Sequence, residues 1–164
     1  MEKIFTSELE DAIKSLHLGG AFLTTSTGAK DNTMTISWGM IGYQWKRPVF
    51  MVLVRKSRYT HDILENSDEF TVSIPKLGKM KEALTLCGSK SGRDMDKFEA
   101  AGLIKANGKK VSVPVISDCL RTYECKVVYK QDMDPKLLNP EIEKLIYNGN
   151  NHHTLYYGEI VSSY

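Results

Sequence analysis

The chain has 164 residues, of which 26% are charged, and a formal net charge of only +2, so neither a nucleic acid nor an anionic membrane is expected as a partner. This length predicts a single domain, residues 1–164, that can bury a core without disulfide bonds. Three cysteines, no apolar leader and no apolar run long enough to span a bilayer predict a cytoplasmic protein that does not enter a membrane.

The N-terminal half contains short strand patterns separated by turn residues. Ser7 and Glu10 have the spacing of a capping box, so a helix is expected to begin there and to stop at Gly19-Gly20. The run Val49–Val54 is rich in β-forming residues and short enough for a buried strand. Together these patterns predict strands at residues 21–26, 33–40, 49–54 and 70–74, and a second helix near residues 61–66.

The C-terminal half mixes helices with further strands. Pro140 suits the first turn of a helix that runs to Tyr147. The other expected elements are a helix at 80–86, a polar loop at 87–92, a short helix capped by Asp94 and ending at Gly102, and strands at 109–113, 120–129 and 155–161. Several strands come first, with short turns, and helices are inserted later. This order favours a mostly β fold with peripheral helices, built on an antiparallel sheet or barrel, over a βαβ series.

The segment Asn32–Trp38 alternates small polar side chains with larger ones. On a strand, Thr33, Thr35 and Ser37 would face one way, opposite to the larger residues. A half-buried strand with its hydroxyl face towards solvent explains this pattern. The glycine that follows Trp38 indicates instead a strand approached closely by a backbone or a ligand. The segment therefore suits either a surface strand or the wall of a site for a flat ring.

The segment Arg55–Thr60 gathers three cations and two aliphatic hydroxyl groups where a helix is expected to begin. Such a cluster can be a solvated surface, with Thr60 as no more than a helix cap. Cations at a helix N-terminus, however, oppose the helix dipole. A bound phosphate would remove that conflict, because the dipole, the free N–H groups and the guanidinium groups all favour an anion. Phosphate binding is thus the preferred hypothesis for this segment.

The loop Cys87–Gly92 can form a backbone nest for an oxyanion or a polyol chain, although a plain connection between helices explains it equally well. Its spacing is not that of a P-loop. The Cys87 thiol lies at the expected end of a helix, where the dipole would raise its pKa, so a nucleophilic thiolate is not expected.

Catalytic side chains and metal ligands are not apparent. His152 and His153 are adjacent rather than at ligand spacing, and no Ser-His-Asp or Cys-His arrangement can be read from the sequence. Asp94 and Asp96 occur beside Arg93 and Lys97, which indicates a helix cap and surface ion pairs. We therefore expect no metal and no catalytic acid, base or nucleophile.

The order of these motifs resembles the flavin reductase-like family, which includes the flavoredoxins. The resemblance covers residues 21–161 and begins with Asn32–Trp38, Arg47-Pro48 and Arg55–Thr60. It continues through Glu69–Ser73, Cys87-Gly88, Ser91-Gly92, Asp96–Phe98 and Gly158–Val161. It implies an antiparallel FMN-binding split β-barrel that forms a homodimer, with one FMN per subunit near the interface.

Carried over residue by residue, the resemblance implies three groups of FMN contacts. The isoalloxazine and ribityl parts would lie along Asn32, Met34, Thr35, Ser37 and Trp38. The phosphate would be held by Ser57, Arg58 and Thr60, with Arg55 and Tyr59. A second loop against the cofactor would consist of Cys87, Gly88, Ser89, Ser91 and Gly92.

The function implied is that of an FMN-dependent oxidoreductase. It would take hydride from NAD(P)H at the FMN and pass electrons to a flavin, ferric iron or a protein acceptor. Because the cofactor performs the chemistry, the lack of catalytic side chains is compatible with an enzyme. The alternatives are a non-catalytic FMN-binding electron carrier and a barrel that binds haem, with His61 as the ligand, or another flavin.

Overall fold

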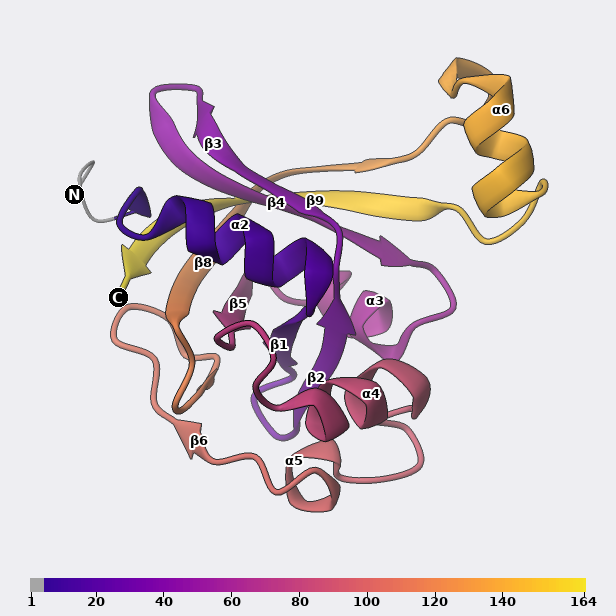
Figure 1. The fold of residues 1–164 in the computed structure, drawn as a ribbon. Helices are drawn as coiled ribbons and strands as arrows, with labels where there is room; N and C mark the ends of the chain where they lie inside the picture. Colours follow the sequence, from indigo (N-terminus) through magenta and orange to yellow (C-terminus); the bar gives the residue numbers. More distant parts are fainter. Residues whose placement is uncertain (1–4) are drawn as a thin grey trace.

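The computed structural model describes residues 5–164, and its main feature is an antiparallel seven-stranded sheet (Figure 1). The strand order in the sheet is β2-β1-β5-β8-β9-β4-β3. The strands are β1 (Ala21–Ser26), β2 (Asp31–Ile36), β3 (Gly39–Gln44), β4 (Arg47–Arg55), β5 (Glu69–Ile74), β8 (Arg121–Asp132) and β9 (His153–Ser163). A separate two-stranded sheet pairs β6 (Lys105–Ala106) with β7 (Val115–Ile116).

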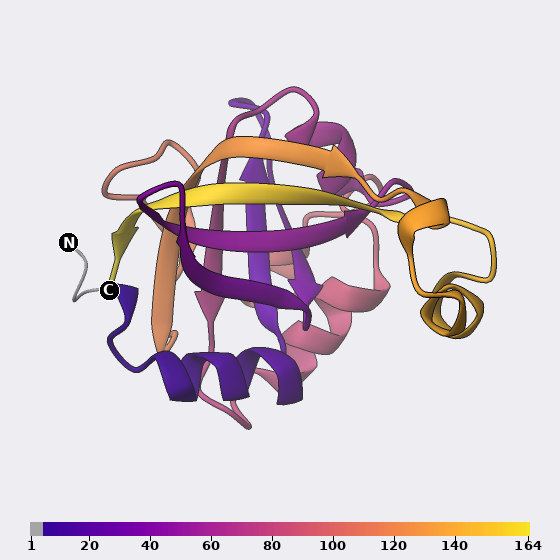
Figure 2. The ribbon, with the colours of Figure 1, turned by 90° about the horizontal axis from the view of Figure 1, so that it is seen from above.

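The sheet curls into a barrel that stays open between β2 and β3. These strands follow each other in the chain, yet they lie at opposite ends of the strand order. Seen from above, β4, β8 and β9 run across β1, β2 and β5, which gives the sheet its barrel curvature (Figure 2). The predicted mostly β, antiparallel split barrel is thereby confirmed.

The predicted strand 33–40 is in fact two strands, because the chain leaves β2 after Ile36 and enters β3 at Gly39. Gly39 pairs with Val52 of β4, and a β-carbon on it would lie only 3.0 Å from the Met51 carbonyl oxygen. The glycine therefore permits a close approach by a neighbouring backbone, one of the two explanations that the sequence left open.

The main core fills the barrel and is closed by the helix α2 (Leu9–Leu18), which lies across it (Figure 1). Ala12 and Leu16 of α2 are buried in this core, as the helical spacing predicts. Gly20, with a φ of 103°, ends the helix in a conformation that glycine adopts without strain. The strands contribute residues such as Leu23, Phe50, Val52, Phe70, Val72 and Tyr123.

The remaining helices lie outside the barrel (Figure 1). They are α3 (Tyr59–Leu64), α4 (Lys81–Ser89), α5 (Lys97–Ala100), α6 (Pro140–Ile142), the 3-10 turn η1 (Pro135–Leu137) and the π-helical turn η2 (Glu143–Tyr147). Helices α4 and α5 enclose a second apolar cluster that contains Phe22, Leu84, Cys87, Phe98 and Ile116. Residues 133–152, which we call the arm, project from the barrel between β8 and β9 (Figures 1 and 2).

Several local predictions are wrong. The helix α2 begins at Leu9, and Glu8, in a left-handed conformation, makes no side-chain cap, so the capping box does not form. Cys87 to Ser89 continue α4 rather than forming a loop, and Asp96, not Asp94, caps α5.

The predicted strand 109–113 is an irregular loop. The buried Glu124 carboxylate accepts hydrogen bonds from the backbone N–H groups of Lys109, Lys110 and Val111, at 2.8, 2.6 and 3.1 Å. These contacts satisfy donors that a β-ladder would otherwise satisfy, which is why β-forming residues here adopt no strand.

No helix within residues 5–164 is long and apolar enough to cross a membrane. The three cysteines, Cys87, Cys119 and Cys125, are free thiols.

Candidate functional site

Two adjoining cavities lie against β2 and share Met34 and Arg58 in their walls. We call the first, of about 120 Å³, the polar cavity; its lining comprises Asn32, Met34, Ser57, Arg58, Tyr59, Thr60, Ser89, Lys90, Ser91, Gly92, Arg93 and Lys97. We call the second, of about 150 Å³, the Trp38 cavity; its lining comprises Met34, Thr35, Ile36, Ser37, Trp38, Leu53, Arg55, Arg58 and His153. The fold thus brings segments from four separate parts of the chain to one place.

The floor of the polar cavity is a fixed pair of buried side chains. The Asn32 side chain donates from Nδ2 to Thr60 Oγ1 at 2.9 Å, and the two residues are only 3% and 1% exposed. Thr60 lies inside α3 and is not its cap, since the cap position is occupied by Arg58. A β-carbon on Gly92 would collide with Asn32 Oδ1, so the loop backbone can reach this floor only because residue 92 is glycine.

The polar cavity has a positive charge that acidic side chains do not balance. Among residues 5–164, neither Arg58 nor Lys97 has a carboxylate partner; Arg58 Nη1 donates to the Gly88 carbonyl at 3.4 Å. Lys97 is buried, and its Nζ donates to the carbonyls of Cys87 and Lys90 at 3.0 and 3.2 Å. Burial, with repulsion from Arg58, lowers the pKa of Lys97. Such a cavity suits an anion rich in oxygen atoms.

Arg93 and Tyr59 shape the outer wall of the polar cavity. Arg93 forms an ion pair with Asp62 at 2.5 Å and donates to the Ser57 carbonyl at 3.3 Å. Two cations lie near the Tyr59 ring: Lys30 Nζ is 5.2 Å from the ring centroid, and the Arg93 guanidinium is 5.4 Å from it. Arg93 is thus largely engaged, which leaves Arg58, Lys90 and Lys97 as the lining cations without a carboxylate partner among residues 5–164.

The Trp38 cavity is flanked by aromatic rings. The Trp38 indole is 48% exposed, and its centroid lies 5.7 Å from that of the His153 ring. His153 Nδ1 and the Tyr147 hydroxyl form a hydrogen bond of 2.6 Å. Burial lowers the pKa of His153 to about 4, and the positive charges of Arg55 and Arg58 contribute. The imidazole is therefore neutral at neutral pH and can offer a hydrogen bond to a ring bound beside it.

The structure brings most of the predicted site residues together. Asn32, Met34, Ser57, Arg58, Tyr59, Thr60, Ser89, Ser91 and Gly92 line the polar cavity. Thr35, Ser37, Trp38 and Arg55 line the Trp38 cavity. Two residues lie on the other side of this division from their predicted group: Asn32, expected at the ring, lines only the polar cavity, and Arg55, expected at the phosphate, lines only the Trp38 cavity. Met34 and Arg58 line both cavities.

Arg55 turns away from the polar cavity towards the arm. Its guanidinium donates to the carbonyls of Asn151 and Ile146 at 3.0 and 3.4 Å and lies 5.1 Å from the Tyr147 ring centroid. The side chain of Asn151 donates to Ser57 Oγ at 2.8 Å. These contacts fix the arm against the cavity wall.

Cys87 and Gly88 line neither cavity. The Cys87 side chain is 1% exposed in the second apolar cluster, and burial raises the pKa of its thiol, which disfavours the thiolate. The Gly88 carbonyl accepts a hydrogen bond from Arg58. A β-carbon added to Gly88 would lie 3.3 Å from the Thr35 Cβ. Both residues therefore lie behind the residues that line the cavities.

Sequence reasoning missed Lys97, Arg93, Lys90 and His153. The adjacent histidines give no spacing signal, and His153 reaches the site only because β9 pairs with β4, with His153 opposite Arg55. Lys97 was interpreted as a partner for surface ion pairs, but it is buried and donates to backbone carbonyls. The signal that could have identified Lys97 is its position between an aspartate cap and an apolar residue at the start of a short helix.

Within the described part of the chain, no group of three or more histidine, cysteine, aspartate or glutamate side chains could hold a metal ion. His61 Nε2 is engaged with Thr154 Oγ1 at 3.0 Å.

The sequence and the fold are similar to those of known proteins. Residues 13–164 match the family model described as the flavin reductase like domain. An uncharacterized protein of Archaeoglobus fulgidus is 30% identical over 155 residues, which cover 94% of this chain and 77% of that protein. The flavoredoxin of Methanosarcina acetivorans superposes with a TM-score of 0.67 at 25% identity, covering 90% of this chain and 68% of that one.

An NADH:FAD oxidoreductase of Streptomyces globisporus C-1027 superposes with a TM-score of 0.70. It is 16% identical and covers 96% of this chain and 81% of its own, a likeness that concerns the fold. From the family model and the Archaeoglobus relative, the chain belongs to the flavin reductase like domain family.

Proposed function

We propose that the protein binds FMN and acts as an NAD(P)H-dependent oxidoreductase. This proposal rests on one observation: two different cavities adjoin along β2. The polar cavity contains cations without carboxylate partners, and the Trp38 cavity is flanked by Trp38 and a neutral His153. A flavin mononucleotide has the matching parts, a phosphate and a flat polar ring.

The residues present fit this cofactor. Arg58 and Lys97 would neutralise the phosphate, and Ser57, Ser91 and Thr60 would offer hydroxyl groups. Thr35, Ser37 and Trp38, at the open edge of the sheet, would border the ring. The buried Asn32–Thr60 contact and the close fit of Gly92 hold these walls in place before any ligand arrives, which reduces the entropy lost on binding.

When bound, FMN supplies a hydride acceptor for NAD(P)H and a donor of electrons to a flavin, ferric iron or a protein. The protein's own residues would orient the cofactor and exclude water from it. The neutral His153 is held by Tyr147, and a donor at its Nε2 would favour negative charge developing on a neighbouring ring. The Streptomyces neighbour, named as an NADH:FAD oxidoreductase, supports the hypothesis that the protein is an oxidoreductase.

The direct test is a titration of the purified protein with FMN, followed by flavin fluorescence. Arg58→Ala should weaken FMN binding by about 1.5–3 kcal/mol, because it removes a charge-assisted contact to the phosphate. Lys56→Ala is the matched control, since Lys56 pairs with Asp132 and lines neither cavity. Equal affinity of the Arg58→Ala variant and the wild type would reject the proposed phosphate site.

A second candidate function is a non-catalytic FMN-binding electron carrier, which the likeness to the Methanosarcina flavoredoxin favours. Anaerobic rapid mixing of the FMN-loaded protein with NADH or NADPH separates the two. Fast bleaching of the flavin absorbance supports the oxidoreductase, whereas an unchanged spectrum with both nucleotides supports the carrier.

We further propose a cytoplasmic homodimer. The tip of the β3–β4 hairpin exposes aromatic side chains, with Trp45 50% and Tyr43 56% exposed. The Trp45 ring packs edge-on against Tyr129 and Tyr157, at 5.9 and 5.7 Å between centroids. An exposed aromatic patch of this kind is typical of a surface that a second subunit covers.

A further inference from the structure

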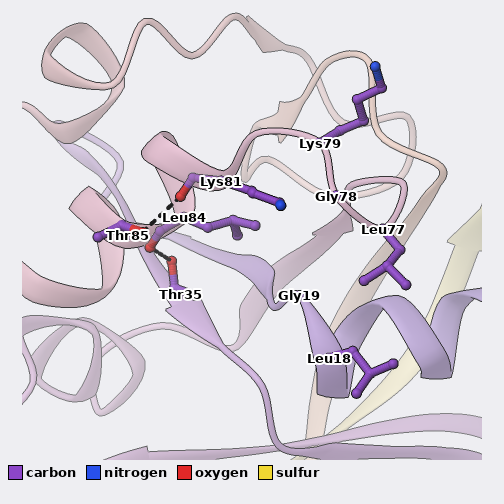
Figure 3. A pocket seen from close by; sticks show the side chains of 9 residues that line it. All are labelled: Leu18, Gly19, Thr35, Leu77, Gly78, Lys79, Lys81, Leu84 and Thr85. Atoms are coloured by element: carbon purple, nitrogen blue, oxygen red, sulfur yellow. Dashed lines mark hydrogen bonds between the residues drawn. The ribbon is translucent and has the colours of Figure 1, made fainter.

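A cavity of about 550 Å³ lies between the end of α2 and the start of α4 (Figure 3). We call it the Lys81 cavity; its lining comprises Leu18, Gly19, Thr35, Leu77, Gly78, Lys79, Lys81, Leu84 and Thr85. Thr35 is the residue that it shares with the Trp38 cavity. Its volume lies within the range typical of sites for small organic molecules.

The walls of the Lys81 cavity offer apolar surface from three different elements. Leu18 at the end of α2 is 59% exposed, and Leu77 in the loop before α4 is 43% exposed. Leu84 of α4 is buried and forms the inner part of the wall. Large leucine side chains exposed around one cavity indicate a surface that an apolar molecule would cover.

The charge of the lining is positive. It contains Lys79 and Lys81 and no aspartate or glutamate, and within residues 5–164 neither lysine forms an ion pair with a carboxylate. Lys81 extends its ammonium group from the start of α4 towards Gly78, whereas Lys79 points away from the cavity (Figure 3). The neighbouring Glu82 lines a different cavity. Lys81 is therefore the cation that a bound molecule would meet.

Thr35 and the end of α2 do not offset this charge. The Thr35 hydroxyl donates to the Leu84 carbonyl at 2.6 Å, so it is already engaged. The carbonyls of Ser15 and Leu16 at the end of α2 accept hydrogen bonds from the N–H groups of Gly19 and Gly20. Of the two lysines without a carboxylate partner, Lys81 is thus the one whose ammonium a molecule in the cavity would meet.

We propose that the Lys81 cavity binds a small organic carboxylate with an apolar body. The carboxylate would pair with Lys81, and the body would pack against Leu18, Leu77 and Leu84. Because Thr35 separates the two cavities, such a molecule would lie next to the proposed flavin ring; this placement rests on the proposed function, whereas the binding itself does not.

The test uses 2-naphthoate as the probe and the methyl resonances of Leu18, Leu77 and Leu84 in the full chain as the readout. Saturable shifts of these resonances are expected, with weaker binding of the neutral analogue 2-naphthylmethanol. Lys81→Gln should raise the dissociation constant of 2-naphthoate by roughly three- to fivefold, as for a partly exposed ion pair. Lys79→Gln, whose side chain points away, should change it by less than about twofold.

The proposal is overturned if 2-naphthoate leaves the three leucine resonances unshifted, or if the alcohol binds as tightly and Lys81→Gln has no effect. Each titration is run with and without FMN, and FMN loading is followed by flavin absorbance. Carboxylate binding without FMN binding would reject the proposed cofactor alone. FMN binding without carboxylate binding would reject the Lys81 cavity alone.

Discussion

His153 is the residue whose chemistry depends most on its surroundings. In sequence it is one of two adjacent histidines; in the structure it is buried beside Arg55 and Arg58, with Tyr147 on Nδ1. Burial, with the charges of Arg55 and Arg58, keeps the imidazole neutral in the folded protein; Arg55 ends β4, Arg58 precedes α3 and Tyr147 belongs to the arm. A charged histidine at this position would add a further cation to a wall that already contains two.

The lowered pKa of His153 predicts how stability depends on pH. The folded pKa of about 4 lies below the unfolded value of 6.5, so the unfolded chain binds the proton more tightly between these values. The free energy of unfolding should therefore fall as the pH drops from 6.5 towards 4, and His153→Gln should lose less stability over this interval than the wild type. Denaturant melts at several pH values measure this.

The exposed His17 provides the control for the pH experiment. His17→Gln should retain the wild-type dependence on pH. If His153→Gln and the wild type lost stability in parallel between pH 6.5 and 4, the neutral buried imidazole would be ruled out.

Gly92 gives a second test at the scale of single residues. Gly92→Ala should weaken FMN binding by about 1–3 kcal/mol, because the new methyl group collides with Asn32 Oδ1 and displaces the loop that carries Ser91. Gly42→Ala, where an added β-carbon meets no atom within 4 Å, should leave the affinity unchanged. Isothermal titration with FMN compares the two, and equal affinities would contradict the tight fit.

Among the elements, the loop that precedes β7 is held by side chains of the sheet, chiefly Glu124 and Glu69, rather than by a ladder. Glu124 of β8 accepts from three successive backbone N–H groups and from the hydroxyl of Tyr164, at 2.8 Å for the latter. The loop consequently depends on a carboxylate that is distant in sequence. For the same reason, the local propensity of residues 109–113 for a strand was misleading.

Glu124→Ala should lower the free energy of unfolding by about 2–3 kcal/mol, because it leaves the buried N–H of Val111 and the part-buried N–H groups of Lys109 and Lys110 without this acceptor. The change is measured by urea denaturation followed by circular dichroism. Glu141→Ala on the exposed arm serves as the control and should shift the midpoint little. A Glu124→Ala variant as stable as this control would show that solvent or another side chain replaces the carboxylate.

For the whole molecule, the open side of the barrel and the exposed hairpin tip are the features that assembly would change. The Trp45, Tyr129 and Tyr157 rings pack on one another at the surface rather than in the core. The proposed dimer would bury this cluster, so the apolar area that the rings now expose to solvent would become part of the interface.

Trp45→Lys should therefore shift the protein from dimer to monomer, since it places a charge in the centre of the proposed interface. Sedimentation equilibrium of both forms measures the mass. Lys46→Ala at the neighbouring position of the same turn is the control. A wild type that sediments as a monomer would reject the dimer, and a dimeric Trp45→Lys variant would reject this surface as its interface.

The sequence by itself determined the local parts: the strand over residues 21–26, the buried strand around 49–54, the glycine stop of the first helix, and the residues of the two segments that line the cavities. Alternation, glycine positions and clustered charge are short-range signals, and the family resemblance ordered them into a split barrel. Only the tertiary structure decided which of these residues face the site. It turned Arg55 towards the arm, buried Cys87, and brought His153 and Lys97 to the cavity walls.

The physical reason is that pairing between distant strands and packing between helices set these contacts. The pairing of β4 with β9 places Arg55 opposite His153 and beside the arm, and the carbonyls of Cys87 and Lys90 at the end of α4 hold Lys97 at the polar cavity. Burial and neighbouring charges then set each pKa, and neither can be read from spacing along the chain.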